Sequence, residues 1–391
     1  YFATFPLIST FILFYENSEE VKISQPLILE LGDLRVKIFF NSMYSLIKPL
    51  LFKVDAEKAH DIGVFLIKNG FLNFFKSPID KKLKISVANI DFPSPLGLAA
   101  GFDKNAEMFN EIHKIGFGFV ETGTVTPKPQ TGNSKPRMFR LKEDLALVNS
   151  LGFNNVGLDS FITNIANYKI NNSFQKIGAN IGPNKDSKNK IQDYIEGLRR
   201  VANIVDYITV NVSSPNTPNL RDFESSNISE LLKEISINRT NRTPIFIKIS
   251  PDLEDKRISF IIESAIKYGL DGLIISNTTK ERSLGLKSNN IVKDGGLSGK
   301  PILNLSNKKL SFAYSVANNS LPLIGVGGIS SGADAYKKIK LGASLVQLYT
   351  SLVYQGPSLV KNINDDLLNL MRLDGVKSIH EIVGTAKLGF K

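Results

Sequence analysis

Cysteine and tryptophan are absent from the 391-residue sequence, and histidine occurs only as His60, His113 and His380. Without cysteine the chain can form no disulfide, no thiolate metal site, no iron–sulfur cluster of its own and no cysteine nucleophile. The three histidines are far apart along the chain, so we expect no metal site. Hydrophobic residues make up 42% and charged residues 22%, which is typical of an ordered globular protein.

Acidic residues are fewer than basic ones: the chain has 37 Asp and Glu and 48 Lys and Arg, which gives a net charge of +11. Residues 1–42 contribute −2, so the rest of the chain carries +13. A basic body can favour nucleic acid, anionic lipid or an acidic small molecule. The lysines are dispersed, and no basic block is interleaved with aromatics. We therefore interpret them as a solvated surface and expect no nucleic-acid partner.

The first residues contain no convincing membrane span or targeting signal. Residues 2–15 are apolar and aromatic, but they include Pro6 and are too short to cross a bilayer comfortably. No basic region precedes them, as a signal peptide would require. We interpret residues 1–42, which lie ahead of the first methionine at Met43, as upstream reading frame or as an extension to which we assign no function.

An amphipathic helical domain is expected at residues 43–77. Residues 43–52 and 56–69 place apolar side chains at helical spacing, and Gly70 is a stop signal. The segment is also rich in lysine, as in helices that lie on a membrane surface. Periodicity alone leaves a second interpretation open, in which the two helices cap the main domain.

Residues 78–391 alternate between strand-like and helical patterns. Apolar runs predict strands at residues 96–100, 117–122, 176–181, 207–212, 244–249, 272–276, 321–326 and 344–348. Helices are predicted at residues 106–115, 192–203, 256–268, 307–318, 333–341 and 357–371. Eight such units favour an α/β fold of the (β/α)8 TIM-barrel type over an open doubly wound sheet. The long stretch 124–175 predicts extra structure or a lid over the site.

Amides, hydroxyls and two lysines follow the predicted strands at their carboxyl ends, where TIM barrels carry their chemistry. Glycine-rich residues 295–299 and 325–328 would let the backbone approach a phosphate, and neither is a dinucleotide or ATP motif. Lys248 ends an apolar strand and suits either a Schiff base or the stabilisation of a reduced flavin. The surrounding asparagines favour the flavin.

The segment after the fourth strand, Asn211 to Thr217, sets Ser214 between two amides. No Ser–His–Asp set accompanies it, so a nucleophilic serine is not supported. Ser214 could transfer a proton, a role that an isolated serine fills poorly. It could equally be a turn residue that bonds the backbone.

Six motifs together resemble the class 2, quinone-dependent dihydroorotate dehydrogenases, in the order and approximate spacing of that family from Met43 to the C-terminus. They are LAAGFDKN at 98–105, ETGTVTP at 121–127, QTGNSKPRMFR at 130–140, NSLGFNN at 149–155, NVSSPNTPNLR at 211–221 and IGVGGI at 324–329. The resemblance implies an FMN-dependent dihydroorotate:quinone oxidoreductase. Such an enzyme converts (S)-dihydroorotate to orotate in de novo pyrimidine (UMP) biosynthesis.

The resemblance also assigns site residues. FMN would be bound by Ala100, Gly101, Lys104, Thr124, Asn180, Asn211, Lys248, Ser276, Gly299, Gly328, Tyr349 and Thr350, the last four around its phosphate. Dihydroorotate would be bound by Lys104, Asn149, Ser150, Leu151, Gly152, Phe153, Asn211, Asn216, Asn277 and Thr278. Ser214 would be the catalytic base, with Thr217 and Phe153 supporting the proton relay.

Reduced flavin would pass electrons to a membrane quinone through a tunnel lined by His60, Arg140 and Tyr349. The resemblance thus implies a peripheral membrane protein, which we place on the cytoplasmic face of a bacterial inner membrane. Two other functions stay open at this point. One is a Schiff-base aldolase barrel that uses Lys248, and the other is a basic barrel without enzymatic activity that binds anionic lipid or nucleic acid.

Overall fold

The computed structural model describes residues 44–386, apart from residues 170–174, 219, 222 and 289–293. The extension predicted at residues 1–42 lies outside the described residues, and the domain division at residue 77/78 stays a prediction.

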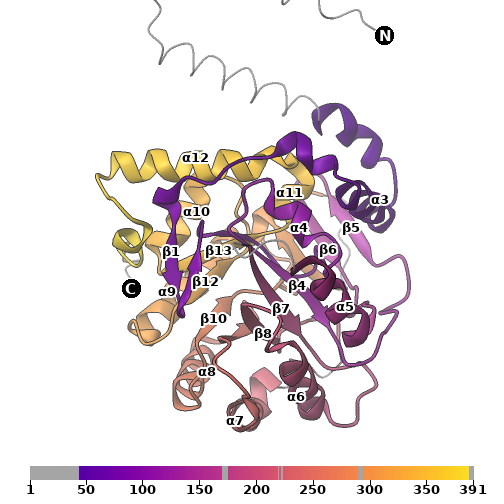
Figure 1. Cartoon of the computed structure of the whole chain (residues 1–391), viewed down its shortest axis with the longest axis vertical. Helices are drawn as coiled ribbons and strands as arrows, with labels where there is room; N and C mark the ends of the chain where they lie inside the picture. Colours follow the sequence, from indigo (N-terminus) through magenta and orange to yellow (C-terminus); the bar gives the residue numbers. More distant parts are fainter. Residues whose placement is uncertain (1–43, 170–174, 219, 222, 289–293, 387–391) are drawn as a thin grey trace, which may run out of the picture. The chain divides into compact units, whose positions relative to one another are not determined.

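Eight parallel strands form a closed barrel, which confirms the predicted TIM-barrel fold (Figure 1). In their order around the barrel they are β3 (Leu96–Leu98), β4 (Phe119–Val125), β7 (Lys176–Ile181), β8 (Tyr207–Asn211), β9 (Ile245–Ile249), β10 (Gly272–Ile275), β12 (Leu323–Val326) and β13 (Ala343–Leu348). Each overlaps one of the predicted strands. Most of their residues are buried, as expected for strands covered on both faces.

Helices surround this barrel on the outside (Figure 1). They are α4 (Phe109–His113), α5 (Gly157–Lys169), α6 (Lys190–Val201), α7 (Ile228–Asn238), α8 (Asp255–Lys267), α9 (Leu303–Ala317), α10 (Gly332–Lys340), α11 (Thr350–Gln355) and α12 (Ser358–Leu373). The sequence did not predict α5, α7 or α11, and the helix predicted at residues 106–115 extends beyond α4 at both ends. Helix α5 is rich in poor helix formers, but burial of Leu158, Phe161 and Ile165 holds it against the barrel.

Aromatic rings fill the end of the barrel that lies opposite the predicted site. Phe119, Tyr207 and Phe246 point inward from three strands and make edge-to-face contacts through Tyr207. Phe92 of the hairpin β1 (Ile85–Val87) and β2 (Ile90–Phe92) adds a fourth ring. Gly97 leaves room for Phe119, since a Cβ at Gly97 would lie 2.3 Å from that ring. The barrel is therefore packed at this end.

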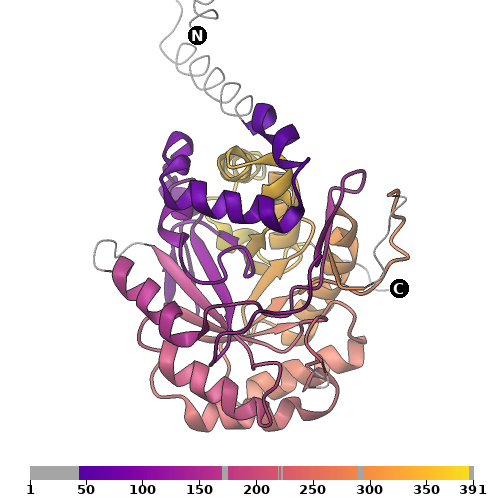
Figure 2. The same cartoon turned by 90° about the vertical axis from the view of Figure 1, so that its right-hand side faces the viewer.

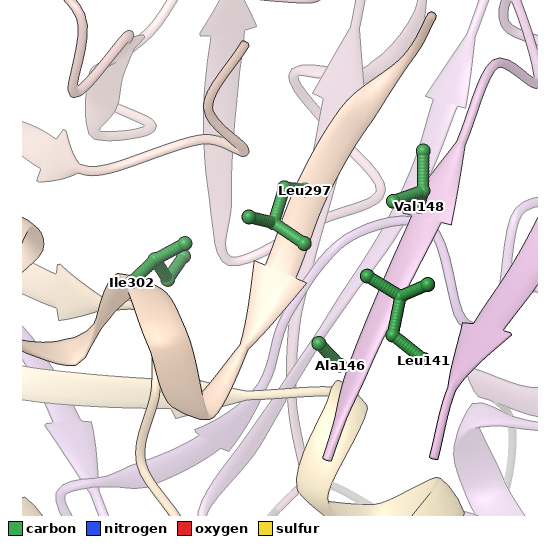
Figure 3. Close-up of a cluster of buried hydrophobic side chains, with 5 residues drawn as sticks. All are labelled: Leu141, Ala146, Val148, Leu297 and Ile302. Atoms are coloured by element: carbon green, nitrogen blue, oxygen red, sulfur yellow. The ribbon is translucent and has the colours of Figure 1, made fainter. Parts of the chain in front are cut away.

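A three-stranded antiparallel sheet, in the order β11-β6-β5, lies beside the open end of the barrel. It consists of β5 (Met138–Leu141), β6 (Ala146–Asn149) and β11 (Gly296–Gly299). The first two strands occupy the stretch in which the sequence predicts extra structure. Leu297 of β11 packs with Leu141, Ala146 and Val148 and with Ile302 of the short helix η4 (Lys300–Ile302) (Figure 3).

Residues 44–51 and α3 (Ala56–Lys68) are helical, as predicted, and η1 (Phe71–Phe75) follows them. Figure 2 shows these indigo helices beside the yellow C-terminal helices. The Tyr44 hydroxyl donates to the carbonyl of Val353 over 2.5 Å, and Arg137 forms a buried ion pair with Glu57 of α3 over 2.7 Å. In the part of the chain described here, no helix combines the length and apolar character that a membrane span needs.

Candidate active site

A cavity of about 1150 Å³, including its open mouth, lies at the carboxyl ends of the barrel strands. Nearly all the predicted site residues line it: Ala100, Gly101, Lys104, Thr124, Asn149, Leu151, Gly152, Phe153, Asn211, Ser214, Asn216, Lys248, Ser276, Asn277, Thr278, Gly299, Gly328, Tyr349 and Thr350. Residues from many separate strands and loops thus converge on one site.

Three predicted residues lie around this cavity rather than on its wall. Asn180 is completely buried one layer below and bonds residues of the wall. Ser150 and Thr217 line an adjoining hollow, which shares Ser214 and Asn216 with the main cavity. The structure thus places these three residues behind or beside the cavity, and their roles stay predictions.

A buried carboxylate fixes the orientation of the amides below the cavity. Glu121 of β4 accepts hydrogen bonds from Asn180 Nδ2 (2.7 Å), Gln347 Nε2 (2.8 Å) and the Tyr207 hydroxyl (3.2 Å). A carboxylate only accepts, so Asn180 must turn its NH2 group to Glu121 and its oxygen the other way. That oxygen then accepts from Asn211 Nδ2 over 3.1 Å.

The same order of donors and acceptors continues from Asn180 to Asn211 and toward the predicted substrate residues. Because Asn211 donates through its NH2 group, its oxygen is free to accept, and it does so from Ser213 (3.1 Å) and Asn277 (3.4 Å). One buried acceptor therefore aligns three asparagines, which lie in β7, at the end of β8 and just after β10. Glu121 and Gln347 were not among the predicted site residues, although a carboxylate inside an apolar strand is a signal that could have identified Glu121.

Lys248 presents a positive charge at the floor of the cavity. Its Nζ lies 3.7 Å from Glu121 Oε1, and both side chains are almost fully buried. A lysine inside a barrel requires a compensating charge, and Glu121 supplies it. The pair explains how an apolar strand can end in a lysine, and it leaves the ammonium beside the cavity, which Lys248 also lines.

Ser214 stands on the loop between the main cavity and the adjoining hollow. Its Oγ accepts from the backbone N–H of Asn216 over 3.3 Å. Arg221 holds the loop by donating to the carbonyls of Ser213 (3.1 Å) and Thr278 (3.0 Å). The buried hydroxyl of Thr217 has no hydrogen-bond partner within the described residues. The loop therefore places the Ser214 hydroxyl at the cavity and the Thr217 hydroxyl at the adjoining hollow.

Lys104 follows β3 at the edge of the cavity, and no ion pair holds it within the described part of the chain. Burial lowers the pKa of its ammonium to about 8, although the nearby Glu57 carboxylate acts in the opposite direction. A desolvated cation at the edge of a cavity gains more from an anionic ligand than a solvated one does. Lys104 is therefore suited to bind a carboxylate.

A second cavity, of about 1050 Å³, lies between the N-terminal helices and the barrel. Its wall is mostly apolar and includes the predicted tunnel residues His60, Arg140 and Tyr349. Burial lowers the pKa of His60 to about 3, so its imidazole is neutral at physiological pH. The ring of Phe102 lies 5.3 Å from His60 and 5.3 Å from Tyr349, centre to centre.

The two cavities share part of their walls. Tyr349, Met138 and Leu147 line both of them. Arg140 is held at the second cavity by its hydrogen bond to the Val54 carbonyl (2.8 Å) and by the ring of Phe52, whose centre is 4.9 Å from the guanidinium carbon. The first cavity, which carries the amides, hydroxyls and lysines and is called the polar cavity below, thus meets the apolar cavity at Tyr349, Met138 and Leu147.

Comparison with known proteins identifies this arrangement. The family model for dihydroorotate dehydrogenase matches residues 82–371. The dihydroorotate dehydrogenase (quinone) of Azorhizobium caulinodans is 43% identical over 350 residues, which cover 88% of this chain and 98% of that protein. The protein of the same name from Agrobacterium fabrum is 43% identical over 345 residues, covering 86% of this chain and 94% of that one.

Solved structures agree with these relatives. The ligand-free crystal structure of dihydroorotate dehydrogenase from Eimeria tenella has a TM-score of 0.79 and 38% identity, and the match covers 85% of this chain and 99% of that one. The ferulenol complex of the Eimeria tenella enzyme has the same TM-score at 37% identity, covering 84% and 95%. The chain therefore belongs to the dihydroorotate dehydrogenase family, in its quinone-dependent class 2.

Proposed function

We propose that the polar cavity binds FMN and (S)-dihydroorotate, and that the apolar cavity admits a membrane quinone, which receives the electrons. The observation that carries the proposal is the wall between the two cavities, where Tyr349 lines both. Two substrates of opposite polarity can then reach opposite sides of one cofactor without meeting. Orotate is the product on the polar side.

The residues of the polar cavity fit FMN. A planar ring with several hydrogen-bonding atoms suits the amide of Asn211, which Asn180 aligns from below, and the ammonium of Lys248. The backbone approaches closely at Gly328, where φ is +77° and a Cβ would lie 2.5 Å from the Leu303 backbone. Such a turn leaves its N–H groups accessible to a phosphate. When bound, FMN supplies the acceptor for the substrate hydride.

The positions of the residues proposed to bind dihydroorotate suggest a role for each of them. Lys104 pairs with the substrate carboxylate. Asn216 donates to the Asn149 side chain over 3.1 Å, so these two amides form one surface for the pyrimidine ring. Ser214, which lines both the cavity and the adjoining hollow, removes the proton from C5, and the Thr217 hydroxyl of that hollow relays it onward. Phe153 shields this side of the cavity.

The N-terminal helices support a peripheral association with a membrane. Leu46, Leu50, Phe65 and Phe74 expose 75%, 64%, 65% and 61% of their surface. Such side chains, together with the lysines of this segment, suit the interface of an anionic bilayer. A quinone could then move from the lipid into the apolar cavity. We assign the protein to the cytoplasmic face of a bacterial inner membrane.

The full-length protein should be yellow, and dihydroorotate added without oxygen should bleach the flavin absorbance. Adding a short-chain quinone should then restore the colour. A preparation that stays colourless when FMN is supplied would contradict the proposal. Borohydride-dependent labelling of Lys248 with a keto substrate would instead support the Schiff-base alternative.

The affinity for dihydroorotate should fall as the pH rises through about 8. The pKa of Lys104 is lowered to about 8 in the free protein, so its amine is protonated below this pH. The affinity for dihydroorotate should therefore be at its maximum below pH 8. Above it, the dissociation constant should increase by about tenfold per pH unit, because binding must first restore the proton. The dependence of the anaerobic flavin-reduction rate on dihydroorotate concentration, followed between pH 6.5 and 10, measures this constant.

The control for this prediction is Lys104→Met, which cannot titrate. Its affinity should be weak and independent of pH over the same interval. A wild-type dissociation constant that stays level from pH 7 to 10 would remove Lys104 from the substrate site.

A further inference from the structure

Lys338 of α10 is a buried cation that the proposed reaction does not use. None of its surface is exposed, and no carboxylate forms an ion pair with it among the residues that the structure describes. Its Nζ donates to Ser306 Oγ and to Asn307 Oδ1, each over 2.7 Å. Burial lowers the pKa of Lys338 to about 7, and the field of Asp334 offsets only part of this effect. A buried ammonium without a counter-ion is unfavourable unless it serves a ligand or a network.

The network leads from Lys338 to the glycine-rich loop after β12. Because Lys338 occupies one acceptor site of Ser306 Oγ, the hydroxyl proton of Ser306 is free to be donated. The carbonyl of Gly327 accepts it over 3.0 Å. Ser306 also lies 3.1 Å from the Leu303 carbonyl, so both acceptors hold the hydroxyl on this side of the loop.

This bond determines which way the next N–H group points. The Gly327–Gly328 peptide is trans, and in a trans peptide the carbonyl and the N–H point in opposite directions. With the Gly327 carbonyl held toward Ser306, the Gly328 N–H points away from Ser306. Both glycines line the polar cavity, and within the described residues nothing accepts a hydrogen bond from this N–H.

The surroundings of the loop leave little freedom for another orientation. A Cβ at Gly325 would lie 3.3 Å from Lys338 Cδ, and one at Gly328 would lie 2.5 Å from Leu303 Cα. Helix α9 thus packs directly against the loop, and Lys338 of α10 packs against the end of β12 that leads into it. A charge at the start of a hydrogen-bond chain strengthens the later bonds in it. The ammonium can therefore act at the cavity without touching it.

We propose that Lys338 is a positioning residue for an anionic phosphate group: through Ser306 it orients the Gly327–Gly328 peptide, so that the Gly328 N–H meets the phosphate of FMN. This inference rests on the proposed FMN site and adds an internal cation to it. In its protonated form, Lys338 contributes positive potential from behind the loop, where water cannot screen it.

The test compares FMN with riboflavin, which lacks only the phosphate. Full-length wild-type protein and Lys338→Met are dialysed to equilibrium against each flavin. Loss of a charge-assisted hydrogen-bond network should weaken FMN binding by about tenfold or more and leave riboflavin binding unchanged. Lys337→Met is the matched control, because Lys337 is exposed on the same helix and its loss should alter neither affinity.

Equal losses for both flavins would assign Lys338 a merely structural role, and no loss would remove it from the phosphate site. Ser306→Ala keeps the cation but removes the connection, so it should also weaken FMN binding selectively. If Lys338→Met does not fold, the result for Ser306→Ala tests the proposal instead. The proposal is overturned if the ratio of FMN affinity to riboflavin affinity is the same in Ser306→Ala and in the wild type. A wild-type chain that binds no FMN overturns the proposed function as well.

Discussion

Replacing Ser214 with alanine should slow flavin reduction by dihydroorotate by roughly 10²–10⁴-fold, the usual effect of losing a general base. Ser214 lies at the boundary of the substrate cavity, and the neighbouring groups are amides and hydroxyls rather than carboxylates or histidines. No aspartate, glutamate or histidine is among the described residues that line this cavity, and Asp294 lies in the adjoining hollow instead, so Ser214 is the side chain placed to accept the proton. Anaerobic stopped-flow absorbance at saturating dihydroorotate measures the step directly.

Two controls separate this effect from damage to the site. Reoxidation of the chemically reduced Ser214→Ala protein by a quinone should proceed at the wild-type rate, because the quinone uses the other cavity. Ser214→Cys should recover part of the reduction rate, since a thiol of comparable size can also accept a proton. Wild-type reduction kinetics in Ser214→Ala would show that the serine does not act as the base.

Replacing Gly63 with leucine should block the quinone while making the protein more stable. Gly63 lies inside α3 and lines the apolar cavity, and a Cβ added there would meet no atom within 4 Å. A leucine would therefore extend into the cavity. Displacing two CH2 groups of the quinone forfeits about 1.6 kcal/mol, or more than tenfold in kcat/KM for quinone. Steady-state assays over a range of quinone concentrations measure this loss.

Stability should change in the opposite direction, because glycine in a helix interior is about 0.5–1 kcal/mol less favourable than leucine or alanine. Chemical denaturation of Gly63→Leu should show this gain, and flavin reduction by dihydroorotate should be unchanged. Gly63→Ala is the matched control: it should gain similar stability and keep quinone turnover. Unimpaired quinone kinetics in Gly63→Leu would show that the quinone takes another path.

Much of the fold could be predicted because its signals are local. Each barrel strand is a short apolar run bounded by turn residues, and the N-terminal helices have a clear helical period. Helix α5 was missed for the opposite reason. Its residues have low helix propensity, and the helix exists because its apolar face is buried against the barrel, a tertiary effect that overrides propensity.

The candidate site was predictable for a related reason. In parallel strands of one barrel the carboxyl ends share an edge, so polar residues such as Asn211 and Lys248 could be placed together from the strand pattern and the motifs alone. The layer below was not predictable in this way. Glu121 and Gln347 bond each other although 226 positions separate them, and no local pattern indicates that they meet.

By itself, the sequence determined the class of fold, the family, and the set of polar groups that face the cavity, because periodicity and motifs are properties of short segments. Only the tertiary structure decided how those groups are oriented and which charges support them. Lys338 shows the difference: it lies among lysines that look solvent-exposed, yet it shares the apolar face of α10 with Ala335 and is buried beside Ser306. Closure of the barrel brings distant segments together, and the direction of each hydrogen bond follows from that closure.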